Sequence, residues 1–294
     1  MKTPNNQIIE QIEAAAGISH RPDGSTYRFL SHEAECAIVH GGAVSHHKVQ
    51  HAALMAEIVP ERYARNQRQL STADQLRLLG AGVAVVGLGG LGGAVVEVLA
   101  RIGVGHLTLI DGDHFADSNL NRQLLSSPAA LGQNKAEVAA RRVAELNPAV
   151  LTATHTIMLT EDNRQGLLTG VDVVMDCLDS IGDRFVLEKG CRQCSVPLIS
   201  AAIGGCAGQV TTIMASDPGL RLIYGDPQRR LHQGAERTMG TLPFAAMGIA
   251  SAACGELVNI VAWGSPRLRG RLLVIDYGGF DADVIELAIA SPNN

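Results

Sequence analysis

Six consecutive residues, Gly87-Leu88-Gly89-Gly90-Leu91-Gly92, have the G-x-G-x-x-G spacing. They follow a short β-branched run at 83–86 and precede a helical pattern at 91–102. In that setting the glycines permit a tight turn and a close approach to a phosphate, and the helix N-terminus presents free N–H groups to the anion. Asp111 lies 24 residues beyond Gly87, where a carboxylate can hydrogen-bond ribose hydroxyls. These residues predict a nucleotide site and leave NAD, FAD, S-adenosylmethionine and ATP open.

Polar side chains further along the chain distinguish between these nucleotides. They are Asn119, Arg122, Gln123, Lys135 and Asp179. Hydride transfer from a nicotinamide needs no arginine, lysine and aspartate near the phosphates. Attack on a nucleoside triphosphate does, because cations must neutralise the phosphoryl oxygens and a carboxylate must hold Mg²⁺. Taken singly, each side chain has a plainer interpretation, such as a solvated charge or, for Asp179, a cap of the helix beginning near Ser180. The ordered set favours an ATP and Mg²⁺ site.

The stretch from Arg62-Tyr63 to Tyr277 resembles the ubiquitin-activating-like superfamily of MoeB, ThiF and HesA. The segment ending in Ile58-Val59-Pro60-Glu61-Arg62 looks most like HesA-type members, which carry a comparable N-terminal extension. The resemblance implies a Rossmann-like α/β fold. It also implies an ATP-dependent adenylyltransferase.

The resemblance assigns a role to each motif residue. Arg65 resembles the arginine finger that reaches the partner subunit's ATP, which implies a homodimer. Lys135 matches the phosphate lysine, and Asp179 matches the magnesium ligand of the D-C-x-D signature. The implied catalytic residues are Arg65, Arg122, Lys135 and Asp179. The implied nucleotide-binding residues are Gly87, Gly89, Gly90, Asp111, Asn119, Arg122, Gln123, Lys135, Asp179 and Ser180.

The implied substrate is the C-terminal glycine carboxylate of a ubiquitin-like sulfur-carrier protein of the MoaD/ThiS kind, which would be adenylated with release of pyrophosphate. The carrier and its pathway, such as molybdopterin or thiamine synthesis, stay open. Three alternatives also remain: a relative that adenylates a tRNA base, an NAD(P)-dependent Rossmann oxidoreductase, and an inactive scaffold that keeps the fold.

The chain departs from many relatives in its cysteines. Where they hold structural zinc with a first C-x-x-C pair, this chain reads Asp217-Pro218-Gly219, and residues 291–294 contain no cysteine. Because a tetrahedral zinc site needs four ligands, we expect no structural zinc. Cys191 and Cys194 then serve as packing residues on a helix. Residues 234–237, where some relatives use a covalent cysteine, contain none, so a thioester or persulfide step is not expected.

The elements that must position these residues alternate from residue 82 onward. Strands are predicted at 83–86, 106–110, 151–156, 171–176 and 197–201, and helices at 91–102, 131–146 and 182–194. This alternation predicts crossover units and a mostly parallel sheet. Strand patterns at 208–215 and 271–277 continue it as an antiparallel portion. The polar stretch 225–241 is a candidate substrate-facing loop or a solvated linker.

We expect two parts. A helical N-terminal extension covers 1–60, with helices at 8–16 and 49–58 and a turn at 21–25. An adenylation domain covers 61–294, with a nucleotide-binding half at about 61–200 and a carrier-binding half at about 201–294.

The composition and charge of the chain argue against nucleic acid as a partner and against a membrane span. The 24 Lys and Arg against 29 Asp and Glu give a net charge of −5, so no basic excess points to nucleic acid. The apolar stretch 242–263 contains Pro243, Glu256 and Asn259 and is predicted to be a buried helix rather than a membrane span. Residues 1–20 show no secretory pattern, and six cysteines without one suggest reduced thiols. We therefore expect a cytoplasmic protein.

Overall fold

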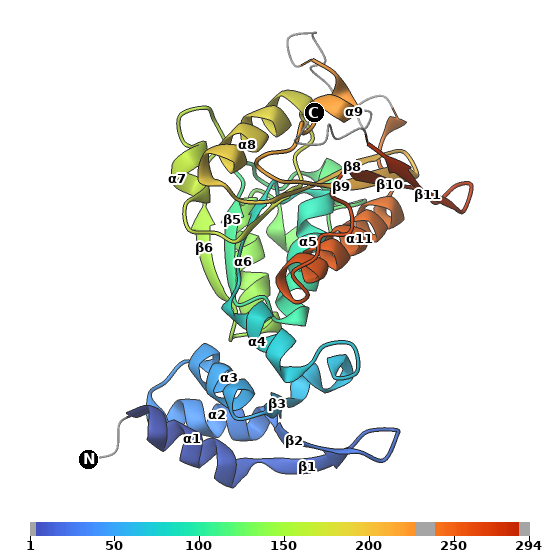
Figure 1. The fold of residues 1–294 in the computed structure, drawn as a ribbon. Coiled ribbons are helices and arrows are strands. Elements are labelled where there is room, and N and C mark those ends of the chain that lie inside the picture. Colours follow the sequence, from blue (N-terminus) through green and yellow to red (C-terminus); the bar gives the residue numbers. More distant parts are fainter. Residues whose placement is uncertain (1–3, 227–238, 288–294) are drawn as a thin grey trace.

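A computed structural model describes residues 4–226 and 239–287 of the chain. Its centre is an eight-stranded sheet in the order β11-β10-β9-β8-β7-β4-β5-β6 (Figure 1). The strands are β4 (Gly82–Val86), β5 (His106–Ile110), β6 (Leu151–His155), β7 (Val173–Asp176), β8 (Leu198–Gly204), β9 (Ala207–Ile213), β10 (Arg271–Asp276) and β11 (Asp281–Glu286). Residues 227–238, within the predicted polar loop, and 291–294, where the second cysteine pair was sought, lie outside the described residues.

The five strands from β6 to β8 are parallel, as the alternating pattern predicted. Their helices are α5 (Gly90–Ile102), α6 (Lys135–Leu146), α7 (Arg164–Leu168) and α8 (Ile181–Cys194). Helices α5 and α6 pack on one face of the sheet, and α7 and α8 pack on the other. The three strands that follow β8 pair in antiparallel fashion. The predicted fold class is therefore confirmed, and β11 is a strand that the sequence pattern did not indicate.

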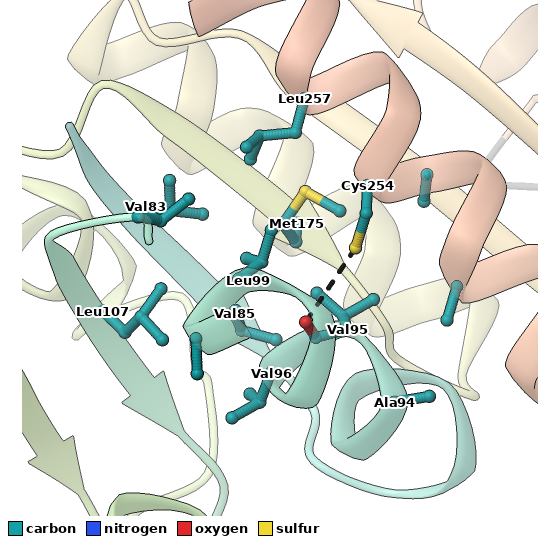
Figure 2. Packing of buried hydrophobic residues seen from close by; sticks show 14 of the residues in the cluster. Val83, Val85, Ala94, Val95, Val96, Leu99, Leu107, Met175, Cys254 and Leu257 are labelled. Atoms are coloured by element: carbon teal, nitrogen blue, oxygen red, sulfur yellow. Dashed lines mark hydrogen bonds between the residues drawn. The ribbon is translucent and has the colours of Figure 1, made fainter. Parts of the chain in front are cut away.

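The main core lies between the sheet and helices α5 and α11 (Pro243–Val261). Figure 2 shows β-branched side chains of β4 facing Leu99 on α5 and Leu257 on α11. Helix α11 is long and apolar enough to cross a membrane by length and composition alone, but it packs on α5 and on strands β8 and β9. Its Cys254 Sγ lies 3.9 Å from the carbonyl oxygen of Val95. This helix is therefore a core element, as its glycines and polar residues predicted.

Residues 4–60 form a small unit below the large sheet (Figure 1). Its helices are α1 (Pro4–Ala15), α2 (His32–Gly42) and α3 (His46–Met55), and its three-stranded sheet contains β1 (Gly17–His20), β2 (Thr26–Leu30) and β3 (Ile58–Pro60). Seven aliphatic side chains form a separate core here. The predicted turn at 21–25 closes the β1–β2 hairpin, where the backbone N–H of Arg21 donates to the Ser25 carbonyl at 2.8 Å. The expectation of a purely helical extension is wrong, because the unit also contains three strands. These strands are short and lie next to turns, so the sequence pattern did not indicate them.

A 3₁₀ segment, η1 (Glu61–Asn66), and helix α4 (Thr72–Gly80) connect this unit to β4. Two further 3₁₀ turns, η2 (Asp117–Asn119) and η3 (Pro128–Ala130), lie in the long connection between β5 and α6. Helix α6 therefore begins at Lys135 rather than at 131, since Asn134 caps it by accepting from the N–H of Ala136 at 2.9 Å. A short helix, α9 (Arg221–Tyr224), follows β9.

Candidate active site

A pocket that opens to solvent lies at the carboxyl ends of the central strands β4, β5 and β7. Eight of the predicted site residues line it, namely Gly87, Gly89, Gly90, Asp111, Arg122, Gln123, Lys135 and Asp179. Ligands of open α/β sheets bind at this edge, because the parallel strands end there and the helices that follow them begin there. Asn119, Ser180 and Arg65 do not line the pocket.

The glycine turn at the pocket is held by close backbone contacts. Gly87 has φ +86°, and a Cβ on it would lie 2.7 Å from the carbonyl oxygen of Cys177. A Cβ on Gly92 would lie closer still to the carbonyl oxygen of Gly87. Helix α5 begins at Gly90, with Gly89 as N-cap and no side-chain capping bond. The first N–H groups of a buried thirteen-residue helix therefore face the pocket and suit an anion.

Asp111 follows β5 and accepts two backbone hydrogen bonds. Leu88 N–H donates to its Oδ2 at 2.6 Å, and Asp113 N–H donates to its Oδ1 at 2.8 Å. Burial raises the pKa of the Asp111 carboxyl above its usual value, against the two backbone hydrogen bonds and the nearby Lys135, which lower it. The carboxylate thus ties the glycine turn to the neighbouring strand, where it can meet a ribose.

Lys135 is the first residue of α6 and is 7% exposed. Its Nζ donates to Asp113 Oδ2 at 3.1 Å, and the Asp113 side chain is itself largely exposed. Among the residues that the structure describes, this buried cation has a single side-chain partner, Asp113, which also lines the pocket. The ammonium is therefore placed to exchange that carboxylate for a phosphate oxygen.

Arg122 and Gln123 come from the loop after η2. Asn119 shapes this loop, because its Oδ1 accepts from the N–H of Ala116 at 3.1 Å and its carbonyl accepts from the N–H of Gln123 at 2.9 Å. The Gln123 side chain is buried, and its Oε1 has no hydrogen-bond partner among the described residues. A buried acceptor without a partner is costly unless a ligand or water satisfies it. The pocket therefore contains an acceptor suited to a bound ligand's N–H or O–H group.

Asp179 is exposed on the loop between β7 and α8. Ser180 caps α8, since its Oγ accepts from the N–H of Asp183 at 3.3 Å. Its place in the nucleotide-binding set stays a prediction. Asp183 also lines the pocket. Mg²⁺ in phosphoryl-transfer sites is held by one or two carboxylates and the phosphates, and these oxygens fit that requirement.

The prediction missed the buried ion pair beneath this loop. Arg184 on α8 donates to Asp176 Oδ2 at 2.7 Å, and Ser200 Oγ donates to the same oxygen at 2.6 Å. Arg184 also donates to the carbonyl oxygens of Ala201 and Leu178, so the guanidinium fixes the loop that carries Asp179. Asp176 belongs to the D-C-x-D signature, but nothing in the sequence pairs it with an arginine eight positions later.

In the segment after β9, which contains no cysteine pair, Asp217 forms an ion pair with Arg269. Asp217 is 5% exposed, and its carboxylate accepts hydrogen bonds from Arg269 Nη2 at 2.7 Å and from the N–H of Met214 at 2.9 Å. Over residues 4–226 and 239–287, no group of three or more His, Cys, Asp or Glu side chains could hold a metal ion. Of the two cysteines predicted as packing residues on α8, Cys191 is buried and Cys194 is only partly buried.

Arg65 lies at the opposite end of the fold. Tyr63, two residues earlier, occupies the space beside Gly103, which directly follows α5. The pocket is at the other end of this thirteen-residue helix, which spans about 20 Å at 1.5 Å per residue. Arg65 therefore cannot enter the pocket of its own chain.

The pattern that defines the ThiF family matches residues 63–294. The chain belongs to the ThiF family. A Salmonella typhimurium protein named molybdopterin-synthase adenylyltransferase is 40% identical over 176 residues, which cover 58% of this chain and 71% of that protein. A Drosophila sechellia protein named adenylyltransferase and sulfurtransferase MOCS3 is 33% identical over 233 residues, covering 76% of this chain. The chain spans about half the length, 51%, of this relative.

Solved structures share the fold of this ThiF-family chain. Escherichia coli MccB in a crystal structure with succinimide has a TM-score of 0.67 at 17% identity, covering 98% of this chain and 88% of that one. PaaA has a TM-score of 0.63 at 20% identity, covering 78% and 82%. Because the match to MccB covers nearly the whole chain, the small N-terminal unit belongs to the shared architecture.

Proposed function

We propose that this ThiF-family chain is an ATP-dependent adenylyltransferase that activates the C-terminal carboxylate of a ubiquitin-like sulfur-carrier protein of the MoaD/ThiS kind. The observation that carries the proposal is one pocket that gathers a glycine turn, a helix N-terminus, a buried lysine and an exposed aspartate. The name of the Salmonella typhimurium relative supports the reaction and the kind of acceptor.

The pocket residues divide the work of binding. The N-terminus of α5 and Lys135 would hold the triphosphate, and Asp111 would accept from the ribose. Arg122 lies beside them, with its Nη1 donating to the Ser118 carbonyl at 2.8 Å within its own loop. Asp179 would hold Mg²⁺, which supplies charge neutralisation at the phosphates.

In the reaction, a carboxylate oxygen of the carrier's last residue attacks the α-phosphorus of ATP. The new bond is a phosphorus–oxygen bond of an acyl-adenylate, and the bond to the bridging oxygen breaks, so that pyrophosphate leaves with its electron pair. The carboxyl group has an ordinary pKa of about 3.5 and is ionised at neutral pH, so no general base is required. Catalysis then rests on positioning and on cations beside the phosphates.

The same residues weigh against the other reactions. Arg122, Lys135 and Asp179 share one pocket and would have no task in hydride transfer from a nicotinamide. The net charge of −5 offers no general attraction for a tRNA acceptor. A retained set of phosphate-binding side chains also speaks against an inactive scaffold.

The active unit in this proposal is a homodimer with two composite sites. Arg65 is exposed and has no hydrogen-bond or ion-pair partner among the described residues, and it lies a full helix length from its own pocket. An arginine in that position is available to a second copy's phosphates. The partner's pocket would thereby gain a third cation beside Arg122 and Lys135.

The test is carrier-dependent exchange between ATP and radiolabelled pyrophosphate, run with each small Gly-Gly-ending protein of the source genome. We expect exchange with one carrier and none with the same carrier after amidation of its C-terminus. Thermal stabilisation by Mg·ATP without exchange by any carrier would contradict a protein acceptor. Stabilisation by NAD instead of ATP would contradict the adenylyltransferase itself.

A further inference from the structure

Arg65 has no hydrogen-bond or ion-pair partner in the described part of the chain, but its neighbours in the sequence are held by other elements. Within residues 62–68 of η1 and the turn after it, Arg62 Nη1 donates to the Leu146 carbonyl at 2.9 Å, and Asn66 Nδ2 donates to Gln75 Oε1 at 3.2 Å. The next two side chains bind the β1–β2 turn, since Gln67 Oε1 accepts from Arg21 at 3.1 Å and Arg68 pairs with Asp23 at 2.5 Å. Every polar side chain around Arg65 in this segment is thus tied to another element.

Tyr63 is the buried anchor of this segment. The side chain is 0% exposed, and burial raises the pKa of its hydroxyl to about 12. The hydroxyl donates to Gln50 Oε1 at 3.0 Å and accepts from Asn147 Nδ2 at 2.8 Å. A Cβ at Gly103 would lie 2.4 Å from the same oxygen, so the phenol packs tightly against this glycine. Both the position and the hydrogen bonds of Tyr63 are therefore fixed.

The contacts of Tyr63 continue on both sides as a buried polar chain. Toward the N-terminal unit, Gln50 Nε2 donates to Glu35 Oε1 at 2.9 Å, and His46 Nδ1 lies 2.7 Å from that oxygen. Toward the large sheet, Asn147 Nδ2 donates to the Ala100 carbonyl of α5 at 3.0 Å. Gln50 and Asn147 are both 0% exposed, and a half-satisfied buried chain of this kind would be costly.

The two helices that this chain reaches are those that carry the phosphate-binding groups. Helix α5 begins at Gly90 in the pocket and ends beside Tyr63, and α6 begins at Lys135 and is capped by Asn147. Tyr63 therefore sets the position of Arg65 against the same helices that set Gly90 and Lys135. One subunit thus carries both halves of the site, joined by buried hydrogen bonds, and a dimer would bring the two halves of different copies together.

We propose that Tyr63 is a positioning residue for Arg65, that Gln50 and Asn147 hold it in place, and that the N-terminal unit thereby shapes the partner subunit's active site. This inference rests on the composite site of the proposed function. A small misplacement of a group that stabilises phosphoryl charge lowers turnover steeply, because its energy depends on distance and direction.

The central test is Tyr63→Phe, which keeps the ring and removes only the hydroxyl. We expect kcat for pyrophosphate exchange to fall about tenfold, with KM for ATP unchanged, because the pocket that binds ATP keeps all its residues. In an Arg65→Ala background, Tyr63→Phe should lower turnover no further, because the residue through which it acts is already gone. Tyr27→Phe is the matched control, since the Tyr27 hydroxyl has no hydrogen bond among the described residues.

Mixed dimers locate the defect. Two affinity tags isolate a dimer of one Tyr63→Phe subunit and one Lys135→Ala subunit. Only the pocket of the Tyr63→Phe subunit still has Lys135, and it receives Arg65 from the Lys135→Ala subunit. We expect that site to turn over at the wild-type rate. A rate as low as that of the Tyr63→Phe homodimer would overturn the inference, as would an equal loss in the Arg65→Ala background.

A dimer of one Arg65→Ala subunit and one Lys135→Ala subunit tests the composite site separately from the role of Tyr63. Activity in that dimer supports the composite site, and its absence contradicts the composite site itself rather than the role of Tyr63. If Tyr63→Phe does not fold, Gln50→Leu replaces it in the same mixed dimer, because it removes the acceptor of the tyrosine hydroxyl and leaves the phenol in place.

Discussion

Arg184 and Asp176 form an ion pair across 2.7 Å beneath the loop that carries Asp179, with side chains that are 5% and 0% exposed. The pair joins α8 to the end of β7 and also receives Ser200. Because the guanidinium bridges the strand, the loop and β8, it fixes the aspartate side of the pocket before any ligand binds.

Loss of this arginine should destabilise the fold strongly. Arg184→Met leaves the Asp176 carboxylate buried without its counter-ion, which we expect to lower the free energy of unfolding by about 3–5 kcal/mol. The control is Arg271→Gln, which breaks the exposed pair with Glu286 and should cost less than about 1 kcal/mol. Urea unfolding followed by circular dichroism measures both. Equal costs for the two variants would show that the buried pair does not hold the loop.

Gly92 allows α5 to pass close to the glycine turn. In Gly92→Ala the new Cβ would collide with the Gly87 carbonyl oxygen, so the turn must shift and stabilisation by Mg·ATP should be lost. Gly255→Ala on α11 is the matched control, since no described atom outside the local helix backbone and the two chain neighbours lies within 4 Å of a Cβ there. Replacing a helical glycine in open space should raise stability by up to about 1 kcal/mol. Thermal shifts with and without Mg·ATP measure both effects, and normal ATP stabilisation in Gly92→Ala would contradict the close contact.

The buried thiols should be chemically inert. Burial raises the pKa of Cys254 to about 12 and raises that of Cys191 further. Because the thiolate is the reactive form, neither should be alkylated by iodoacetamide at pH 8 in the native protein, whereas the partly exposed Cys36 should react. Peptide mass spectrometry measures the sites. Alkylation of Cys191 or Cys254 in the native protein would contradict their burial.

Acidification should weaken the contact between α3 and β5. The rings of His47 and His106 lie 4.9 Å apart between centroids, and burial together with His47 lowers the pKa of His106, against Asp172, which raises it. The folded-state pKa thus lies below the unfolded value of about 6.5, so stability is intact above that pH and falls as the pH drops through the folded pKa. His106→Gln should flatten Tm between about pH 7 and pH 5. An unchanged slope in that variant would assign the pH dependence to other groups.

Only part of this fold and its candidate site could be predicted from local patterns in the sequence. The glycine turn, Asp111 and the alternating strands were predictable because each depends on neighbouring residues, and the structure brings Asp111 and Lys135 to one pocket. The N-terminal sheet was missed because its strands are only three to five residues long, too short for a periodic pattern to be recognised. The Arg184–Asp176 pair could not be predicted because it depends on how α8 packs against β7. The contacts of Tyr63 could not be predicted because its partners, Gln50 and Asn147, lie on other segments of the chain.

Intact-mass spectrometry of the carrier protein tests the central claim most directly. After incubation with this enzyme, ATP and Mg²⁺, in the presence of pyrophosphatase, the carrier should gain the mass of AMP less one water, and the Lys135→Ala enzyme should leave it largely unmodified. The expected ratio of initial rates is about 10²–10³, the usual cost of removing one charge-stabilising donor. A carrier that keeps its mass with the wild-type enzyme, while the enzyme binds Mg·ATP, would contradict adenylation of a protein carboxylate.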